Sequence, residues 1–310
     1  MLKLKNICVN FEVENNKYIP VVENVSFDIK DNEKIFIVGE TGSGKSILLL
    51  SILDLLPQNA KTSGDILFEN NNISNFSKKE LGKLRGSKIS YIPQGNASAF
   101  NPLIKIWKQI AAPLLIHKIC TKENAYKAAI SKLEELDFEN ASKWGNLYPH
   151  NLSGGMKQRA LIAMGTITNA KLILADEPTK GLDEYRRSEI EKIFNSFIDK
   201  SILCVTHDLY FAQNVASKII VMYAAQVIEL CDKSNFFKNP LHPYSQMMIN
   251  SLVENGMKYA NGFAPPHTDY KIHGCRFKDR CIHASSKCNE SPPIFEFNNR
   301  KVRCWIYDKT

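Results

Sequence analysis

The feature that most restricts the fold of this 310-residue chain is a glycine-rich segment between two apolar runs. Residues 39–46 read G-E-T-G-S-G-K-S, a full match to the phosphate-binding pattern G-x-x-x-x-G-K-[ST]. Residues 35–38, just before it, form a continuous apolar run that is typical of a strand buried on both faces of a parallel sheet. Residues 47–53, just after it, predict a buried helix. The chain is therefore expected to be an α/β protein.

A strand, a glycine turn and a helix N-terminus together form a cradle for phosphate groups. Glycines let backbone N–H groups converge on phosphate oxygens, and the helix dipole favours an anion at this end. Lys45 is expected to reach the β- and γ-phosphates, and the Ser46 hydroxyl to bind Mg²⁺. The predicted nucleotide-binding residues of the loop are Gly39, Glu40, Thr41, Gly42, Ser43, Gly44, Lys45 and Ser46.

Two further apolar runs end in polar residues. Residues 172–175 lead into Asp176 and Glu177, and residues 202–205 lead into Thr206 and His207. An acid at the carboxyl end of a parallel strand faces the ligand crevice. Asp176 is therefore predicted to hold the Mg²⁺ shell and Glu177 to polarise the attacking water. The alternative is a solvated strand end, which the phosphate loop makes the weaker interpretation.

A second anion site is indicated by Ser153, Gly154 and Gly155. Ser153 has the character of a helix N-cap, and the glycines allow close backbone approach. Because the chain already has a phosphate cradle, a second one makes sense if it covers the ATP held by a partner chain. The alternative is an ordinary capped helix, but the flanking residues, Leu152 before the segment and Gln158-Arg159 after it, favour the first interpretation.

These motifs and their order resemble the ATP-binding-cassette family over residues 1–250. The resemblance implies a phosphate-loop NTPase (RecA-like) core with a small antiparallel β subdomain, a helical insert subdomain and a pair of chains that sandwich ATP. It implies that His207 contacts the γ-phosphate beside the catalytic Glu177. It also implies that Gln94 is the lid glutamine and joins Ser46 and Asp176 around Mg²⁺. Asp183 would lie at the dimer interface. An aromatic residue upstream of the loop usually stacks on adenine, and Phe11 and Tyr18 both qualify.

The tail narrows the resemblance. Residues 239–252 look like the segment that ends the cassettes of oligopeptide, dipeptide and nickel importers, with Asn-Pro and His-Pro predicting a turn before a helix. A polar linker follows at 256–266. Around Gln94, Pro93-Gln94-Gly95-Asn96 replaces the more usual Phe-Gln-Asp-Pro of peptide importers, which leaves peptide, nickel and metallophore substrates open.

Four cysteines lie within the last 36 residues, with the spacing C-x5-C-x6-C-x15-C. Such thiols in a reducing compartment favour a metal over disulfides. The set resembles the C-terminal cysteines of peptide-importer ATPases, which implies a [4Fe–4S] cluster; Zn²⁺ with help from His273 or His283 is the alternative. Arg276, Lys278 and Arg280 would offset the negative charge of a cluster. The predicted ligands are Cys275, Cys281, Cys288 and Cys304.

Composition limits the alternatives. The formal net charge is +8, but the basic residues are dispersed, so no nucleic acid is expected as a partner. No run approaches the ~18 apolar residues of a membrane span, and the best candidate, residues 104–119, is broken by charged residues and proline. Residues 65–68 and 88–92 predict strands, and residues 123–136 predict a helix with an apolar stripe at Ala125, Ala129, Leu133 and Leu136. No heptad run is present, which disfavours chromosome-maintenance ATPases.

The sequence therefore predicts an ATP-hydrolysing importer subunit at the cytoplasmic face of the membrane, with a cassette at 1–252, a helical insert at roughly 97–165 and a four-cysteine extension at 253–310. Its expected partners are a second, different cassette subunit, two membrane permeases and, indirectly, an extracytoplasmic solute-binding protein. The alternative is a non-transport cassette ATPase that acts on nucleic acid.

Overall fold

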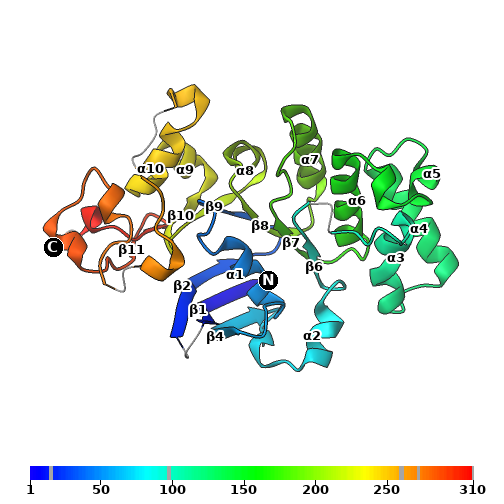
Figure 1. Ribbon diagram of the computed structural model, residues 1–310, viewed down its shortest axis with the longest axis horizontal. Helices are drawn as coiled ribbons and strands as arrows, with labels where there is room; N and C mark the ends of the chain where they lie inside the picture. The colour runs from blue at the N-terminus through cyan, green and yellow to red at the C-terminus, as the bar shows by residue number, and fades with distance from the viewer. Residues whose placement is uncertain (14–16, 96–98, 258–261, 271–272, 309–310) are drawn as a thin grey trace. The chain divides into compact units, whose positions relative to one another are not determined.

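The computed structural model describes residues 1–13, 17–95, 99–257, 262–270 and 273–308. Asn96, the start of the expected helical insert and part of the expected linker at 256–266 lie outside these ranges. The chain divides into two compact units. The first unit comprises Met1, Ile29–Lys34 and Asn75–Val215, and the second comprises Leu2–Asp28, Ile35–Ser74 and Ala216–Thr310. Figure 1 labels many of the helices and strands of both units.

The second unit contains a four-stranded sheet in the order β2-β1-β4-β5. β1 pairs antiparallel with β4 from Leu2↔Phe68 to Phe11↔Ala60, and the strand predicted at 65–68 is the end of β4. The alternate apolar residues Leu2 and Leu4 are buried, as the period of two in a strand requires. The four strands are β1 (Leu2–Val13), β2 (Lys17–Ile29), β4 (Ala60–Phe68) and β5 (Asn71–Asn72).

A second set of strands in this unit runs in the order β11-β12-β10-β9-β3. β3 is parallel to β9, whereas β9, β10, β12 and β11 pair antiparallel in turn. The predicted buried strand at 35–38 is confirmed, since each of its residues is at most 1% exposed. The strands are β3 (Lys34–Val38), β9 (Lys218–Tyr223), β10 (Gln226–Asp232), β11 (Phe295–Phe297) and β12 (Arg300–Val302).

The helices of the second unit follow these strands. α1 (Lys45–Ile52) confirms the helix predicted after the glycine-rich segment and begins two residues earlier than predicted. α9 (Lys233–Lys238) leads to the predicted turn and helix, which are also confirmed: His242 caps α10 (Pro243–Asn250) by accepting the Tyr244 N–H at Nδ1, 3.0 Å away. Short 3-10 helices complete the tail: η4 (Val253–Asn255), η5 (His267–Asp269), η6 (Lys278–Arg280), η7 (Ser286–Asn289) and η8 (Trp305–Tyr307).

The first unit contains three parallel strands in the order β8-β7-β6. Every residue of β7 and β8 is buried, which confirms the strands predicted at 172–175 and 202–205. The predicted strand at 88–92 is β6. The strands are β6 (Ile89–Ile92), β7 (Leu172–Asp176) and β8 (Ser201–Thr206), and the helices after β7 and β8 are α7 (Glu184–Ser196) and α8 (Leu209–Val215).

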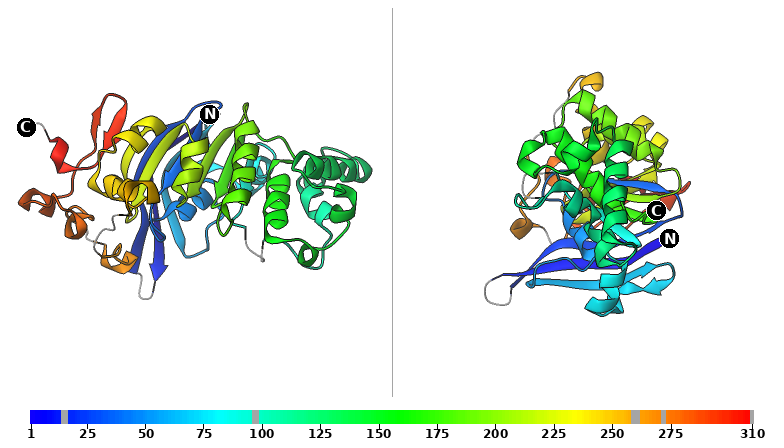
Figure 2. Two further views of the ribbon diagram at one scale, coloured as in Figure 1. Left: turned by 90° about the horizontal axis from the view of Figure 1, so that it is seen from above. Right: turned by 90° about the vertical axis from the view of Figure 1, so that its right-hand side faces the viewer.

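The remaining helices of this unit include a group that lies side by side, from α3 to α6 (Figures 1 and 2). The stripe predicted at Ala125, Ala129, Leu133 and Leu136 is buried and faces this group. In the described ranges every helix falls short of the length and apolar character needed to cross a bilayer. The elements are α2 (Lys78–Leu84), α3 (Ile106–Ile116), α4 (Lys122–Glu135), α5 (Ala141–Gly145), η3 (Pro149–Asn151) and α6 (Gly154–Thr166). The short η2 (Ile73–Asn75) precedes α2, and its first two residues belong to the second unit.

Candidate functional site

The glycine-rich loop of the second unit runs from the end of β3 to the start of α1, and two of its glycines are required by close backbone contacts. A Cβ on Gly39 would lie 2.1 Å from the Met222 carbonyl oxygen of β9. A Cβ on Gly44 would lie 2.2 Å from the Val21 carbonyl oxygen, and Gly44 also has a φ of 97°. Because only glycine fits at both positions, the loop can wrap tightly in front of the helix N-terminus.

Lys45 is 6% exposed and points back into this loop. Its ammonium donates to the carbonyl oxygens of Gly39 and Glu40 at 2.8 Å each, and its Nζ lies 3.5 Å from the Ser43 hydroxyl oxygen. Ser46 follows Lys45 in the first turn of α1. A positive charge is thus held inside a ring of backbone groups, which is the arrangement that a polyphosphate requires.

The two aromatic candidates for stacking on adenine lie on the antiparallel sheet. Phe11 is paired with Ala60 across β1 and β4. Tyr18 is 38% exposed, its hydroxyl donates to Glu12 at 3.1 Å, and the Lys61 ammonium lies 4.4 Å from its ring centroid. One face of the Tyr18 ring therefore already interacts with a cation.

In the first unit, the ends of the neighbouring strands β7 and β8 bring Glu177 and His207 together. Glu177 Oε2 lies 2.8 Å from His207 Nδ1 and accepts from the His207 N–H and the Thr206 hydroxyl at 3.3 Å each. Glu177 has a φ of 47°, a left-handed conformation that is uncommon for a residue with a side chain. Since the carboxylate only accepts, Nδ1 carries the proton in this contact.

Asp176 lies at the end of β7, 5% exposed, and has a partner that the sequence did not reveal. The Tyr91 hydroxyl of β6 donates to Asp176 Oδ2 at 3.3 Å. Burial, together with the negative charge of Asp176, raises the pKa of Tyr91, so this hydroxyl stays a donor. Beneath the acids, burial raises the pKa of Cys204 well above its usual value, which keeps that thiol neutral. Asp176 is thus oriented by a neutral hydrogen-bond donor.

The segment that contains Gln94 follows β6 and packs on helix α6. A Cβ on Gly95 would lie 1.5 Å from the side-chain oxygen of Gln158, so a larger residue there would have to displace the Gln158 amide. Gln158 belongs to the helix that starts at the Ser-Gly-Gly segment. The structure therefore joins two motifs that are more than 50 residues apart in the sequence.

The Ser-Gly-Gly segment begins α6 as predicted, and the capping role of Ser153 is confirmed: its hydroxyl accepts the Met156 N–H at 3.3 Å. Gly154 is open, whereas a Cβ on Gly155 would lie 3.1 Å from Arg186 Cδ. Asp183 caps α7 by accepting the Arg186 N–H at 2.9 Å. The N-termini of α6 and α7 are therefore neighbours, joined through Arg186.

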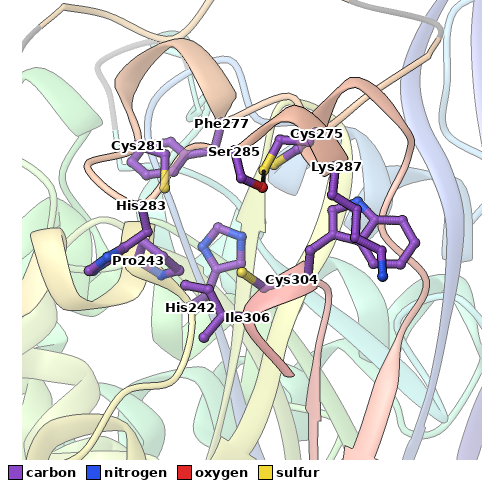
Figure 3. Close-up of a pocket in the computed structure, with 12 residues that line it drawn as sticks. His242, Pro243, Cys275, Phe277, Cys281, His283, Ser285, Lys287, Cys304 and Ile306 are labelled. Carbon is purple, nitrogen blue, oxygen red and sulfur yellow. Dashed lines mark hydrogen bonds between the residues drawn. The ribbon is translucent and has the colours of Figure 1, made fainter. Parts of the chain in front are cut away.

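The four C-terminal cysteines surround one cavity of about 250 Å³ in the second unit (Figure 3). Burial is the main cause of raised pKa values at Cys275, Cys281 and Cys304, and the neighbouring thiols of the set contribute; the pKa of Cys304 is raised to about 11. Among the described residues there is no group of three or more His, Cys, Asp or Glu side chains that could hold a metal ion. His283 lines the cavity, whereas His273 is exposed.

Comparisons with known proteins agree with these features. Residues 22–180 match the ABC transporter family, and residues 228–288 match the C-terminal region of oligopeptide/dipeptide transporters. The oligopeptide transport ATP-binding protein AppD of Bacillus subtilis is 34% identical over 100% of this chain and 97% of its own length. The corresponding protein OppD of Escherichia coli is 32% identical, over 98% of this chain and 92% of its own length.

A solved structure of the ATP-binding cassette MJ0796, a dimer in a post-hydrolysis state with ADP and Pi, superimposes with a TM-score of 0.68. It is 29% identical, and the alignment covers 75% of this chain and 99% of the other. This likeness supports the predicted α/β phosphate-loop fold. The chain therefore belongs to the ABC transporter family, in which such a cassette is the ATP-hydrolysing part.

Proposed function

We propose that this protein is the ATP-hydrolysing subunit of an ABC importer for peptides. The observation that carries the catalytic part is the Glu177–His207 contact of 2.8 Å at the ends of two parallel strands. The match of residues 228–288 and the names of the relatives support peptides as the solute. Nickel or a metallophore is the weaker candidate, because its support is limited to the segment at 239–252 and the residues around Gln94.

In the proposed site, residues 39–46 bind the phosphates of ATP, and Lys45 supplies the positive charge. Mg²⁺ would be held by Ser46, Gln94 and Asp176, with Asp176 oriented by Tyr91. Glu177 would polarise the attacking water, and His207 Nε2 would face the γ-phosphate. Supporting this assignment, the contact of His207 Nδ1 with Glu177 fixes the orientation of the imidazole ring.

The α6 N-terminus would serve a second nucleotide. Ser153, Gly154 and Gly155 begin a helix beside Asp183 and Arg186, and they would cover the ATP of a partner cassette. We infer a heterodimer of cassettes that binds two permeases at the cytoplasmic face of the membrane and acts with an extracytoplasmic binding protein. The alternation of ATP binding and hydrolysis would drive the permeases.

We assign residues 1–252, with the helical insert at roughly 97–165, to the cassette and residues 253–310 to the extension, as a division by function. The antiparallel sheet β2-β1-β4-β5 and the helix group α3 to α6 would be the small β subdomain and the helical insert. The two compact units divide the chain differently, because the tail packs with the phosphate loop in the second unit.

We propose that the cysteine cavity holds a cofactor larger than one ion, although no described group of three or more His, Cys, Asp or Glu side chains is arranged to hold a metal ion. Cys275, Cys281, Cys288 and Cys304 line a space of about 250 Å³ whose wall also includes Phe277. A [4Fe–4S] cluster held by these four thiolates would supply a redox-active, covalently ligated cross-link of the tail. Zn²⁺ with His283 is the alternative.

Anaerobically purified protein is expected to show a broad absorbance near ~400 nm and roughly four irons per chain. Cys288→Ser should lower the iron content, because it removes one of the proposed ligands. Cys8→Ser, which changes a thiol in β1, should leave it unchanged. Protein that contains one zinc and has no colour would contradict the cluster.

The solute is tested by uptake in cells that lack this chain, with labelled short peptides and labelled nickel offered side by side. Peptide uptake should be lost, restored by the wild-type chain and not restored by Glu177→Gln. Loss of nickel uptake alone would assign the importer to metal. If neither changes and the protein binds DNA with strong salt dependence, the non-transport alternative gains support.

A further inference from the structure

The tail reaches back to the phosphate loop through an ion pair. Arg280 Nη1 lies 3.0 and 3.2 Å from the two carboxylate oxygens of Glu40, the second residue of the loop. Their side chains are 10% and 32% exposed, so the pair is partly shielded from water. Arg280 ends η6, the turn that separates Cys275 from Cys281. A residue far outside the loop is therefore in direct contact with it.

Aromatic side chains hold Arg280 in this position. Its guanidinium lies 5.7 Å from the ring centroid of Tyr223 and 5.6 Å from that of Phe277, and it donates to the Tyr223 hydroxyl at 3.3 Å. A guanidinium stays protonated in proteins and donates only. The guanidinium is thus a fixed positive charge.

The same cluster fixes the backbone of the loop. The Tyr244 hydroxyl, on a side chain that is fully buried, accepts the Glu40 N–H at 2.9 Å, and the ring packs 4.6 Å from Tyr223. Further along, the Tyr270 hydroxyl donates to the Gly42 carbonyl oxygen at 3.2 Å. Residues from α10 and from the tail therefore hold the first half of the loop at two points.

Glu40 poses an electrostatic problem for a loop that binds a triphosphate. Its backbone carbonyl contacts the ammonium of Lys45, so its carboxylate belongs to the same small region as the bound anion. A negative charge there opposes ATP, and in a partly buried site the effect of one charge is on the order of tenfold in affinity. Arg280 supplies the compensating charge.

We propose that Arg280 is a positioning residue of the nucleotide site, which neutralises Glu40 and keeps the loop able to accept ATP. The proposal rests on the assignment of residues 39–46 as the ATP site. It makes the tail part of the nucleotide site through Glu40, the loop residue that Arg280 contacts. Arg280 would affect the ATP affinity through its charge, whereas a purely structural role would not depend on the charge of Glu40.

The test measures the equilibrium dissociation constant of ATP with Mg²⁺ for the full chain and its variants. Arg280→Gln should weaken binding about tenfold, because Glu40 is left uncompensated. The double variant Glu40→Gln/Arg280→Gln should recover to the affinity of Glu40→Gln alone. Arg280→Lys keeps the charge and should stay within about threefold of wild type. Raised salt should shrink the defect of Arg280→Gln.

The matched control is Lys301→Gln, which breaks a different ion pair of the tail, 2.7 Å long, with Glu296 on β11. It should leave the ATP affinity unchanged. Iron content and thermal melting of each variant show whether the tail is still folded. If Arg280→Gln binds ATP like wild type, or if the double variant stays as weak as Arg280→Gln, the proposal is overturned. If the wild-type chain binds no ATP, the proposed function fails instead.

Discussion

Replacing Glu177 with glutamine should lower the rate of ATP hydrolysis by about two to four orders of magnitude, the usual contribution of a group that takes up a proton from the attacking water. Glu177 is held by three donors on Thr206 and His207, all to the same oxygen, Oε2. Glutamine has nearly the same shape but carries no charge, so it loses the ability to polarise water. The phosphate loop is unchanged, so ATP should still bind.

The measurement is the steady-state release of phosphate, with size-exclusion chromatography in ATP to detect a trapped dimer with the partner cassette. Glu184→Gln is the matched control, because Glu184 lies in the first turn of α7 and its side chain is 90% exposed. It should hydrolyse ATP normally. Turnover close to wild type in Glu177→Gln would remove Glu177 from the catalytic role.

Replacing Lys45 with alanine should abolish nucleotide binding. The ammonium is the positive charge inside the loop, and it is also held there by the carbonyl oxygens of Gly39 and Glu40. Alanine removes the attraction for the β- and γ-phosphates and leaves those two carbonyl oxygens without this donor. Both effects weaken ATP binding. The affinity should fall by more than about a hundredfold, because two charge-assisted hydrogen bonds to the β- and γ-phosphates are lost.

An equilibrium titration with a fluorescent ATP analogue measures this loss. Thermal melting should show no upward shift of Lys45→Ala with ATP, whereas the wild type is stabilised by ligand binding. Lys3→Ala serves as control, since Lys3 pairs with Asp28 on the surface of the antiparallel sheet. Saturable binding by Lys45→Ala with near wild-type affinity would show that nucleotide binds elsewhere.

The strands and helices that carry the site could be predicted, because their signals are local. The runs at 35–38, 172–175 and 202–205 are short and apolar along their whole length, which is typical of a strand buried on both faces. Glycines and polar residues at their ends then locate the loop and the acids. The helix at α4 was predicted to within one residue from its buried stripe.

The contacts that hold the site could not be predicted, because they join residues far apart in the chain. Arg280 and Glu40 are 240 positions apart, and Tyr91 and Asp176 are 85 apart. In the sequence, Arg280 lies next to Cys281 and was interpreted as offsetting the charge of a metal cluster. None of its sequence neighbours indicates a contact with the phosphate loop. The left-handed backbone of Glu177 has no sequence signal either, since glutamate rarely adopts it.

Because β12 of the tail pairs with β10, a chain shortened to residue 252 would lose part of the sheet that carries the phosphate loop. Glu229 and Leu230 of β10 are paired with Val302 and Lys301, and buried Glu229 also contacts Arg300 at 3.3 Å. Truncation would remove Arg300 and leave the buried carboxylate of Glu229 without this cation. It would also open a strand edge to pairing with other molecules. We therefore expect a chain shortened to residue 252 to aggregate more readily than the 310-residue chain.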